Sequence, residues 1–229
     1  MTDKEGPVVT LDGPAGSGKS STAHEVSRRL KFRHLDSGAL YRALTLALLQ
    51  RGIAQQDWPV VSETDLLDLD VDIQPTTDGF IVLVGGHRVD AELRSPEVTA
   101  GVSHLAKLPA VRASLLELQR RAGAHGRLVA DGRDMGTVVF PHAEVKVFLV
   151  ADVEERARRR MREQGAIEGD VEELERQVQA IEARDRRDSE RELSPLRRAA
   201  DAHEIDTTRL DFDHQVEEII SLVYRLTTP

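Results

Sequence analysis

The side chains in this sequence most suited to chemistry lie in a glycine-rich segment close to the N-terminus. Residues 13–20 read GPAGSGKS and fit the spacing G-x-x-x-x-G-K-[ST]. In such a loop, backbone N–H groups can converge on phosphate oxygens, and the N-terminus of the following helix adds a partial positive charge. We therefore expect this segment to hold the phosphates of a nucleotide, through Gly13, Pro14, Ala15, Gly16, Ser17, Gly18, Lys19, Ser20 and Ser21.

Two residues at the end of the loop suit phosphoryl transfer. Lys19 would reach the β- and γ-phosphates of ATP and neutralise charge that builds up there, while the Ser20 hydroxyl would bind Mg²⁺. A carboxylate beside the first strand would assist the metal, directly or through water. Asp131, which ends an apolar run, is the better candidate, and Asp12 is the weaker one. A tight turn that binds nothing is the alternative, and the complete motif disfavours it.

The surrounding sequence places this loop between a strand and a helix. The apolar run at 7–12 predicts a strand, and the pattern at 19–30 predicts a helix. Further apolar runs, separated by helix-like stretches, predict strands at 127–131, 145–150 and 202–206. This alternation indicates an α/β fold with a parallel sheet flanked by helices.

Two other regions depart from that alternation. Short apolar runs at 71–75, 80–84 and 88–89 are too closely spaced for helical crossovers, so they predict a small antiparallel β insertion. Residues 153–198 are very polar and show helical spacing, which predicts either a mobile helical lid or a solvated helical hairpin.

The composition disfavours several other functions. Without cysteine, the chain has no disulfide, thiolate metal site or cysteine nucleophile. Its net charge of −9 disfavours nucleic acid as a partner, because nucleic-acid affinity depends on a basic surface. No apolar stretch approaches the ~18 residues of a membrane span, and no secretory signal is evident. We expect a cytoplasmic monomer with no membrane partner.

Three segments together resemble the bacterial cytidylate kinases: GPAGSGKSS from residue 13, LDSGALYR at 35–42, and ADGRDMGTVVFP at 130–141. The resemblance implies a P-loop kinase that transfers the γ-phosphoryl group of ATP to CMP or dCMP with Mg²⁺. A GTPase is disfavoured independently, because a chain without asparagine cannot carry the guanine-reading motif N-K-x-D. The resemblance also divides the chain into a core P-loop domain (1–36, 104–150 and 199–229), a monophosphate-binding region (37–103, with the antiparallel insertion at about 70–90) and a lid (151–198).

The same resemblance assigns acceptor residues. Arg42, Arg133 and Arg191 would hold the α-phosphate of CMP, and with Lys19 they form the expected catalytic set. Ser103, Arg112 and Asp134 would bind the cytosine edge, Arg184 and Asp188 would lie near the sugar, and Ser37 and Tyr41 would complete the pocket. Taken without the family pattern, Tyr41 is equally compatible with a core residue, and Arg184 and Asp188 with an ordinary surface ion pair.

In the lid, Arg156, Arg158, Arg159, Arg160 and Arg162 form an arginine-rich stretch at helical spacing. We expect Arg156 and Arg160 to bind ATP phosphates, although a solvated helix face is a serious alternative. The eight histidines lack ligand spacing and receive no role. Two other functions stay open at this point: a P-loop kinase acting on UMP, AMP or shikimate, and a nucleotide-binding protein without turnover.

Overall fold

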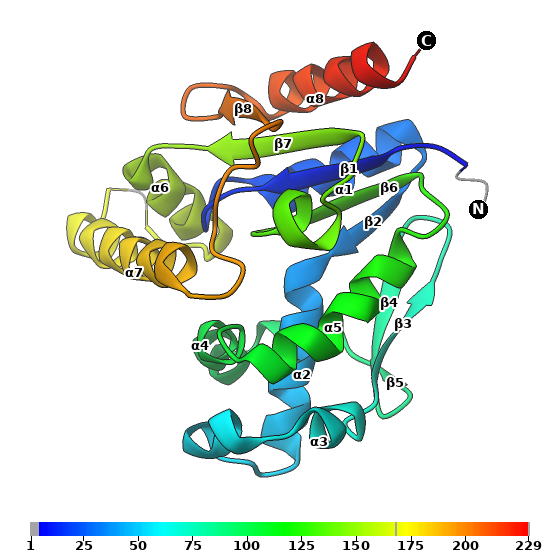
Figure 1. Cartoon of the computed structure of the whole chain (residues 1–229). Coiled ribbons are helices and arrows are strands. Elements are labelled where there is room, and N and C mark those ends of the chain that lie inside the picture. The colour runs from blue at the N-terminus through cyan, green and yellow to red at the C-terminus, as the bar shows by residue number, and fades with distance from the viewer. Residues whose placement is uncertain (1–4, 168, 229) are drawn as a thin grey trace.

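A five-stranded parallel sheet runs through the centre of the computed structural model, which describes residues 5–167 and 169–228 (Figure 1). The strand order is β2 (Arg33–Asp36), β6 (Leu128–Gly132), β1 (Val8–Asp12), β7 (Val145–Val150) and β8 (His203–Asp206). All four predicted parallel strands, at 7–12, 127–131, 145–150 and 202–206, match the observed strands within one residue at each end.

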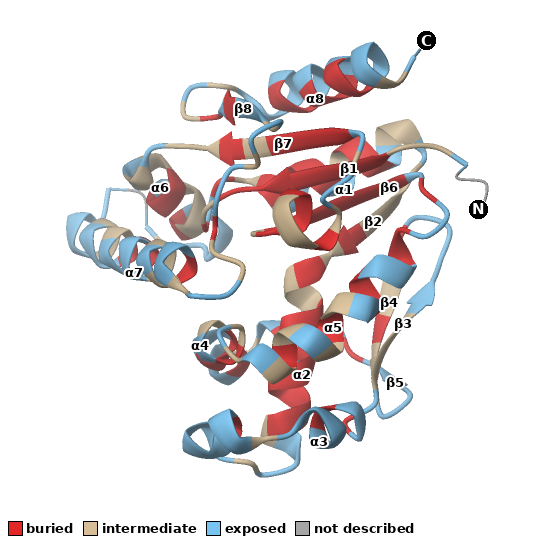
Figure 2. Cartoon of the chain, viewed as in Figure 1, coloured by how far each residue is buried: buried red, intermediate tan, exposed pale blue. Residues whose placement is uncertain are grey.

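Alternation along the central strands gives the sheet two apolar faces. Val9 and Leu11 pack with α1 (Lys19–Leu30) and α8 (Phe212–Thr227), whereas Val8 belongs to the cluster on the opposite face. Figure 2 shows these strands as the most continuously buried part of the molecule. A parallel sheet covered on both faces is expected to carry such apolar strands.

Strand β2 was not predicted. Of its four residues only Leu35 is fully buried and apolar, while Arg33, His34 and Asp36 are polar and partly buried. Its conformation depends on pairing with β6, in which His34 lies opposite Val129 and Asp36 opposite Asp131. A strand formed by tertiary pairing leaves little trace in local hydrophobic periodicity.

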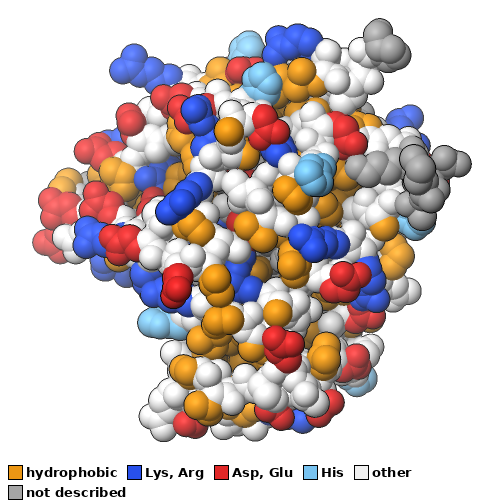
Figure 3. Space-filling model, in the orientation of Figure 1, with side chains coloured by type: hydrophobic (Ala, Val, Ile, Leu, Met, Phe, Trp, Pro, Cys, Tyr) orange, Lys and Arg blue, Asp and Glu red, His pale blue; other side chains and the backbone are white. Residues whose placement is uncertain are grey.

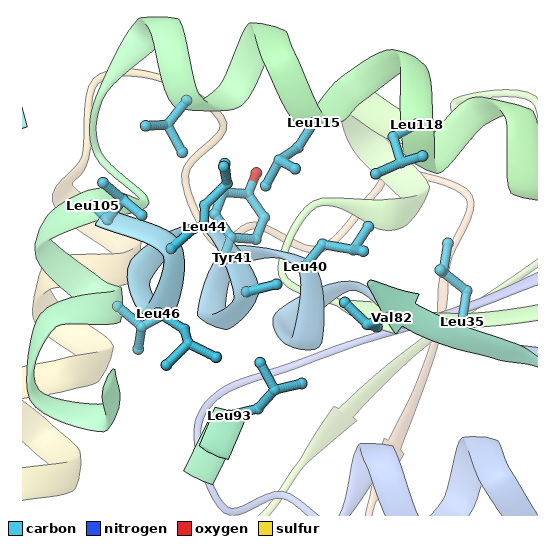
Figure 4. Packing of buried hydrophobic residues seen from close by; sticks show 14 of the residues in the cluster. Leu35, Leu40, Tyr41, Leu44, Leu46, Val82, Leu93, Leu105, Leu115 and Leu118 are labelled. Atoms are coloured by element: carbon cyan, nitrogen blue, oxygen red, sulfur yellow. The ribbon is translucent and has the colours of Figure 1, made fainter. Parts of the chain in front are cut away.

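A second lobe lies between β2 and β6 in the sequence. Helix α2 (Ser37–Gln50) forms its centre and is surrounded by α3 (Glu63–Leu67), α4 (Pro96–Leu105) and α5 (Pro109–Ala122). Figure 4 shows Tyr41 of α2 among Leu44, Leu105 and Leu115. Short helical turns, η1 (Gln55–Val60) and η2 (Ala91–Arg94), complete the connections.

The antiparallel insertion is confirmed. Strands β3 (Val71–Pro75), β4 (Phe80–Val84) and β5 (His87–Arg88) form a separate antiparallel sheet, with β4 in the middle. Its β3–β4 turn reaches the central sheet, where the backbone N–H of His34 donates to Asp78 O at 3.0 Å. The insertion is therefore joined to the edge of β2.

Helices α6 (Val153–Glu163) and α7 (Val171–Glu190) pack together and lie beyond the C-terminal ends of β1 and β7 (Figure 1). They correspond to the polar segment that we expected to be helical. The assignment of residues 151–198 as a mobile lid, like the division of the chain into domains, stays a prediction. In the described ranges no helix is long and apolar enough to cross a membrane.

Candidate active site

The glycine-rich loop joins β1 to α1 and opens at the C-terminal edge of the sheet. Gly16 and Gly18 have φ angles of 75° and 84°, in the left-handed region that favours glycine. A Cβ atom on Gly13 would lie 2.2 Å from Leu149 O, so this position admits only glycine. The side chain of Ser17 is buried, and its Oγ has no hydrogen-bond partner in the part of the chain that the structure describes. This backbone is shaped as an anion-binding loop.

Lys19 is 7% exposed and its Nζ donates to Pro14 O at 3.0 Å, so it folds back over the loop. Burial, reinforced by the positive charge of Arg133, lowers the pKa of Lys19 to about 7. An anionic ligand would offset both effects. Lys19 and Arg133, which directly follows β6, are therefore close enough for their charges to interact.

Ser20 and Asp131 are in direct contact, as a shared metal site requires. The Ser20 hydroxyl donates to Asp131 Oδ2 at 2.5 Å, and Asp131 Oδ1 accepts from His34 Nε2 at 2.8 Å. Burial alone would raise the pKa of Asp131, but the hydrogen bond and charge of His34 hold it below its usual range. Asp131 is thus a buried, ionised carboxylate at the base of the phosphate loop.

Asp12 has a different environment from Asp131. Its carboxylate accepts hydrogen bonds from the backbone N–H groups of Met135 and Gly136 at 2.9 and 2.8 Å, at the start of the helical turn η3 (Met135–Val139). Burial raises its pKa to about 7 despite these two bonds. Its contacts fix the chain that follows Arg133 and Asp134.

The arginines assigned to the acceptor lie close enough for their charges to act on one another or on Lys19: Arg133 and Arg184 act on Lys19, Arg42 acts on Arg184, and Arg112 acts on Arg191. Arg133 Nε donates to Asp188 Oδ2 at 2.8 Å, and this partner holds the pKa of Asp188 below its usual range although burial opposes the shift. Burial lowers the pKa of Arg184 to about 10, with Arg133 adding to the effect.

Two of these arginines keep unused donors. Arg184 Nε and Arg191 Nη2 are buried with no hydrogen-bond partner among the described residues. Burial also lowers the pKa of Arg191. Buried cationic donors without partners are costly unless an anion completes them. In Figure 3, side chains of Lys and Arg gather below α7, between it and α4.

The expected base-recognition residues divide into a connected pair and a separate serine. Arg112 forms an ion pair with Asp134, and the two side chains are 10% and 3% exposed. Arg112 also lies 5.6 Å from the centre of the Tyr41 ring and donates to Ala106 O at 3.2 Å, next to the end of α4. Ser103 is half-buried on α4 and has no described contact with Arg112 or Asp134.

Ser37 and Tyr41 are buried on the first turns of α2. Gln119 of α5, which is 1% exposed, donates through Nε2 to Ser37 Oγ at 3.4 Å. Tyr41, Arg112, Gln119 and Asp134 line one pocket together with Leu193 and Ser194 from the segment after α7. Burial raises the pKa of Tyr41 to about 12, so its hydroxyl stays protonated near neutral pH. Arg42 follows Tyr41 on α2, and its Nη1 lies 3.7 Å from Asp36 Oδ2.

The lid arginines differ in their surroundings. Arg156 is buried, donates to Ala15 O at 2.9 Å and forms an ion pair with Asp185. Arg160 is half-buried, and its positive charge helps to lower the pKa of Arg184. It therefore lies near the arginine cluster. Arg158 and Arg162 instead form exposed ion pairs with Glu154 and Glu155, as the solvated-face alternative predicts for them.

Comparisons with known proteins identify the family of the chain. A sequence model described as "Cytidylate kinase" matches residues 9–225. The chain belongs to the cytidylate kinase family. A cytidylate kinase from Anoxybacillus flavithermus is 43% identical over 219 residues, spanning 94% of this chain and 95% of that protein. Another, from Geobacillus kaustophilus, is 45% identical over 215 residues with the same coverage.

Among solved structures, an uncharacterized protein from Eubacterium ventriosum has a TM-score of 0.52 at 11% identity. It covers 96% of this chain, and the match covers 99% of that protein. At that identity the comparison supports the fold alone. The comparison of its arginine cluster with an acceptor site therefore rests on the sequence similarity to cytidylate kinases.

The donor set beside the loop fits the magnesium ion that a cytidylate kinase would use. Within residues 5–167 and 169–228, no group of three or more His, Cys, Asp or Glu side chains could enclose a metal. Mg²⁺ characteristically binds through one or two protein oxygens and completes its shell with water and substrate phosphates. Ser20 and Asp131 offer that kind of site.

Several contacts at the site are made by residues that no motif in the sequence indicates. His34, Gln119 and Asp185 received no role, yet they touch Asp131, Ser37 and the phosphate loop respectively. None belongs to a motif whose spacing indicates chemistry. The polar character of Asp185, flanked by arginines in α7, was the only available signal, and a solvated helix gives the same pattern.

Proposed function

We propose that this member of the cytidylate kinase family transfers the γ-phosphoryl group of ATP to CMP or dCMP with Mg²⁺, through the residues described above. The observation that carries this assignment is the position of Lys19, at a phosphate loop, within electrostatic reach of a cluster of buried arginines. Two adjacent anion sites suit two phosphorylated substrates. A nucleotide-binding protein without turnover would have no use for the second site.

In the proposed reaction an oxygen of the acceptor phosphate attacks the γ-phosphorus of ATP. The bond from that phosphorus to the β–γ bridging oxygen breaks, giving ADP and CDP or dCDP. No general base is required, because a phosphate monoester is already largely ionised near neutral pH. The protein's contribution is alignment and charge neutralisation, by Lys19 on ATP and by Arg42, Arg133 and Arg191 on the acceptor.

Magnesium would be held by Ser20, with Asp131 as its hydrogen-bonded carboxylate, and when bound it would neutralise charge on the ATP phosphates. Arg160 is placed to approach those phosphates from α6. Arg156 already contacts the loop through Ala15 O and Asp185, so its proposed role on ATP requires that this ion pair opens or shifts.

Selection of cytosine is assigned to Asp134, Arg112 and Ser103. A carboxylate can accept a hydrogen bond from the amino group of cytosine, whereas uracil presents a carbonyl oxygen at that position. A buried unmatched polar group costs about 1–3 kcal/mol, which corresponds to roughly 10- to 100-fold discrimination. The pairing of Arg112 with Asp134 holds this carboxyl group in a fixed position in the pocket that both residues line.

The test is release of ADP, in a coupled assay with Mg²⁺ and ATP, for CMP, dCMP, UMP, AMP, GMP and shikimate. Lys19→Ala is the blank. We expect turnover with CMP and dCMP well above that with the other acceptors. Preference for UMP, AMP or shikimate would overturn the cytosine assignment, and ATP binding without turnover on any acceptor would overturn the kinase assignment.

A further inference from the structure

His34 is the partner of Asp131 that no motif indicates. The side chains of His34 and Asp131 are 14% and 3% exposed, and Nε2 lies 2.8 Å from Oδ1. The two oxygens of the carboxylate therefore have separate partners, because Oδ2 accepts from the Ser20 hydroxyl at 2.5 Å. A hydrogen-bonded series runs from His34 through Asp131 to Ser20.

The direction of these hydrogen bonds determines whether the Ser20 oxygen can bind a cation. Asp131 accepts a hydrogen bond from the Ser20 hydroxyl, which leaves the lone pairs of that oxygen free for a metal. The N–H of His34 on Oδ1 holds the carboxylate in the orientation in which Oδ2 meets Ser20. Without that bond the buried carboxylate could rotate, and the hydroxyl would lose its acceptor.

His34 is itself fixed by its surroundings. Its backbone is paired in register with β6 and donates to Asp78 O of the β3–β4 turn at 3.0 Å. Gly79 packs against it so closely that a Cβ atom there would lie 2.8 Å from His34 O. The ring meets His24 of α1 edge to face, with centroids 5.9 Å apart. A residue whose backbone is fixed by two elements and whose ring packs against a third can orient another group.

We propose that His34 is a positioning residue for the metal-binding end of the phosphate loop, acting on Ser20 through Asp131. This inference rests on the proposed use of Mg²⁺ by this enzyme. It also links the antiparallel insertion to the ATP site, since the β3–β4 turn supports the strand that carries His34.

The matched variants are His34→Gln and His34→Met. Glutamine presents an amide N–H as many bonds from Cα as Nε2 of histidine, and methionine has similar length but no donor. Two quantities are measured: the Mg²⁺ concentration giving half-maximal CMP phosphorylation, and the factor by which Mg²⁺ tightens ADP binding at equilibrium. The second does not depend on turnover. His142→Met, at an exposed histidine, is the control.

We expect His34→Met to raise the required Mg²⁺ roughly 10- to 100-fold, as is typical when a group that orients a metal ligand is removed. It should reduce the Mg²⁺-dependent tightening of ADP binding by a similar factor. ADP binding in EDTA and CMP binding should not change, and His34→Gln should stay within about threefold of the wild type. If His34→Met does not fold, His34→Leu replaces it.

Three results would overturn the inference: unchanged Mg²⁺ dependence in the donor-free variant, equal loss of ADP binding with and without Mg²⁺, or no rescue by glutamine. Assays of the wild-type protein distinguish a failure of this inference from a failure of the proposed function. If it shows no CMP phosphorylation, the proposed function fails. If it is active and His34→Met behaves as wild type, only the role of His34 fails.

Discussion

At the scale of single residues, the site is organised by carboxylates that assign a direction to each arginine. Asp134 pairs with Arg112, Asp188 with Arg133, and Asp36 lies close to Arg42. Each pair orients a planar donor before substrate arrives, which reduces the ordering needed on binding. Among the described residues, Arg184 Nε and Arg191 Nη2 have no hydrogen-bond partner, although Arg191 Nη2 lies 3.9 Å from Asp134 Oδ1, so both donors are open to a ligand.

Replacing Asp134 with asparagine should change the choice of base. The amide keeps the shape of the carboxylate but can donate to a carbonyl oxygen, so the variant no longer favours the amino group of cytosine. We expect kcat/KM for CMP to fall roughly 10- to 100-fold and the CMP-to-UMP ratio to fall by at least that factor. Steady-state kinetics with both acceptors provide the measurement.

Asp188→Asn is the matched control for this prediction. Asp188 pairs with Arg133, away from the expected base contacts, so its loss should reduce activity with CMP and UMP in similar proportion. An Asp134→Asn variant with an unchanged CMP-to-UMP ratio would refute the assignment of this residue to the base.

At the scale of elements, local sequence signals predicted those parts that carry their own periodicity. The runs at 7–12 and 145–150 became β1 and β7 because burial on both faces favours apolar residues at most positions. Strand β2 escaped prediction because three of its four residues are polar and its pairing with β6 determines its conformation.

The same distinction applies to the site. Ser20 and Asp131 could be predicted because a motif and a strand end indicated them, and the structure brings them into contact. His34 could not, since its partner lies 97 positions away in sequence and on the strand beside its own. Gln119 likewise reaches Ser37 only through the packing of α5 on α2. Such pairs are set by tertiary packing.

The end of β1 supports a prediction about pH. Burial raises the pKa of Asp12 from 3.8 to about 7, so between these values the folded protein binds a proton that the unfolded chain has released. The contribution of this group to stability is therefore complete below about pH 4 and is lost as the pH rises through about 7. Asp12→Asn cannot titrate and should lack this part of the decline.

Urea unfolding at pH 5 and pH 8 measures the effect. We expect the wild type to lose about 1–3 kcal/mol more than Asp12→Asn between the two conditions, whatever constant offset the lost hydrogen bond to η3 introduces. Asp57→Asn, an exposed change on η1, should follow the wild type. Parallel curves for wild type and Asp12→Asn would contradict the raised pKa.

At the scale of the whole molecule, α7 contacts both of the proposed substrate sites. Asp185 Oδ1 accepts from the backbone N–H of Ala15 in the phosphate loop at 3.0 Å, and Asp188, one helical turn later, accepts from Arg133. A nucleotide that changes the contact of Asp185 with the loop must therefore act on the helix that holds the acceptor arginine. Linkage of this kind is reciprocal between the two ligands.

Asp185→Ala should weaken that linkage. In the wild type we expect a non-hydrolysable ATP analogue and CMP to alter each other's affinity by a common factor, of order 5- to 150-fold. In the variant the factor should fall toward one, while CMP affinity without the analogue stays within about twofold, because Asp188 and Arg133 remain paired. Calorimetric titration of each ligand, alone and with the other saturating, measures this factor.

Glu182→Ala, exposed on the same helix, should retain the wild-type factor. If Asp185→Ala also retains it, α7 does not transmit binding between the sites through its contact with the phosphate loop.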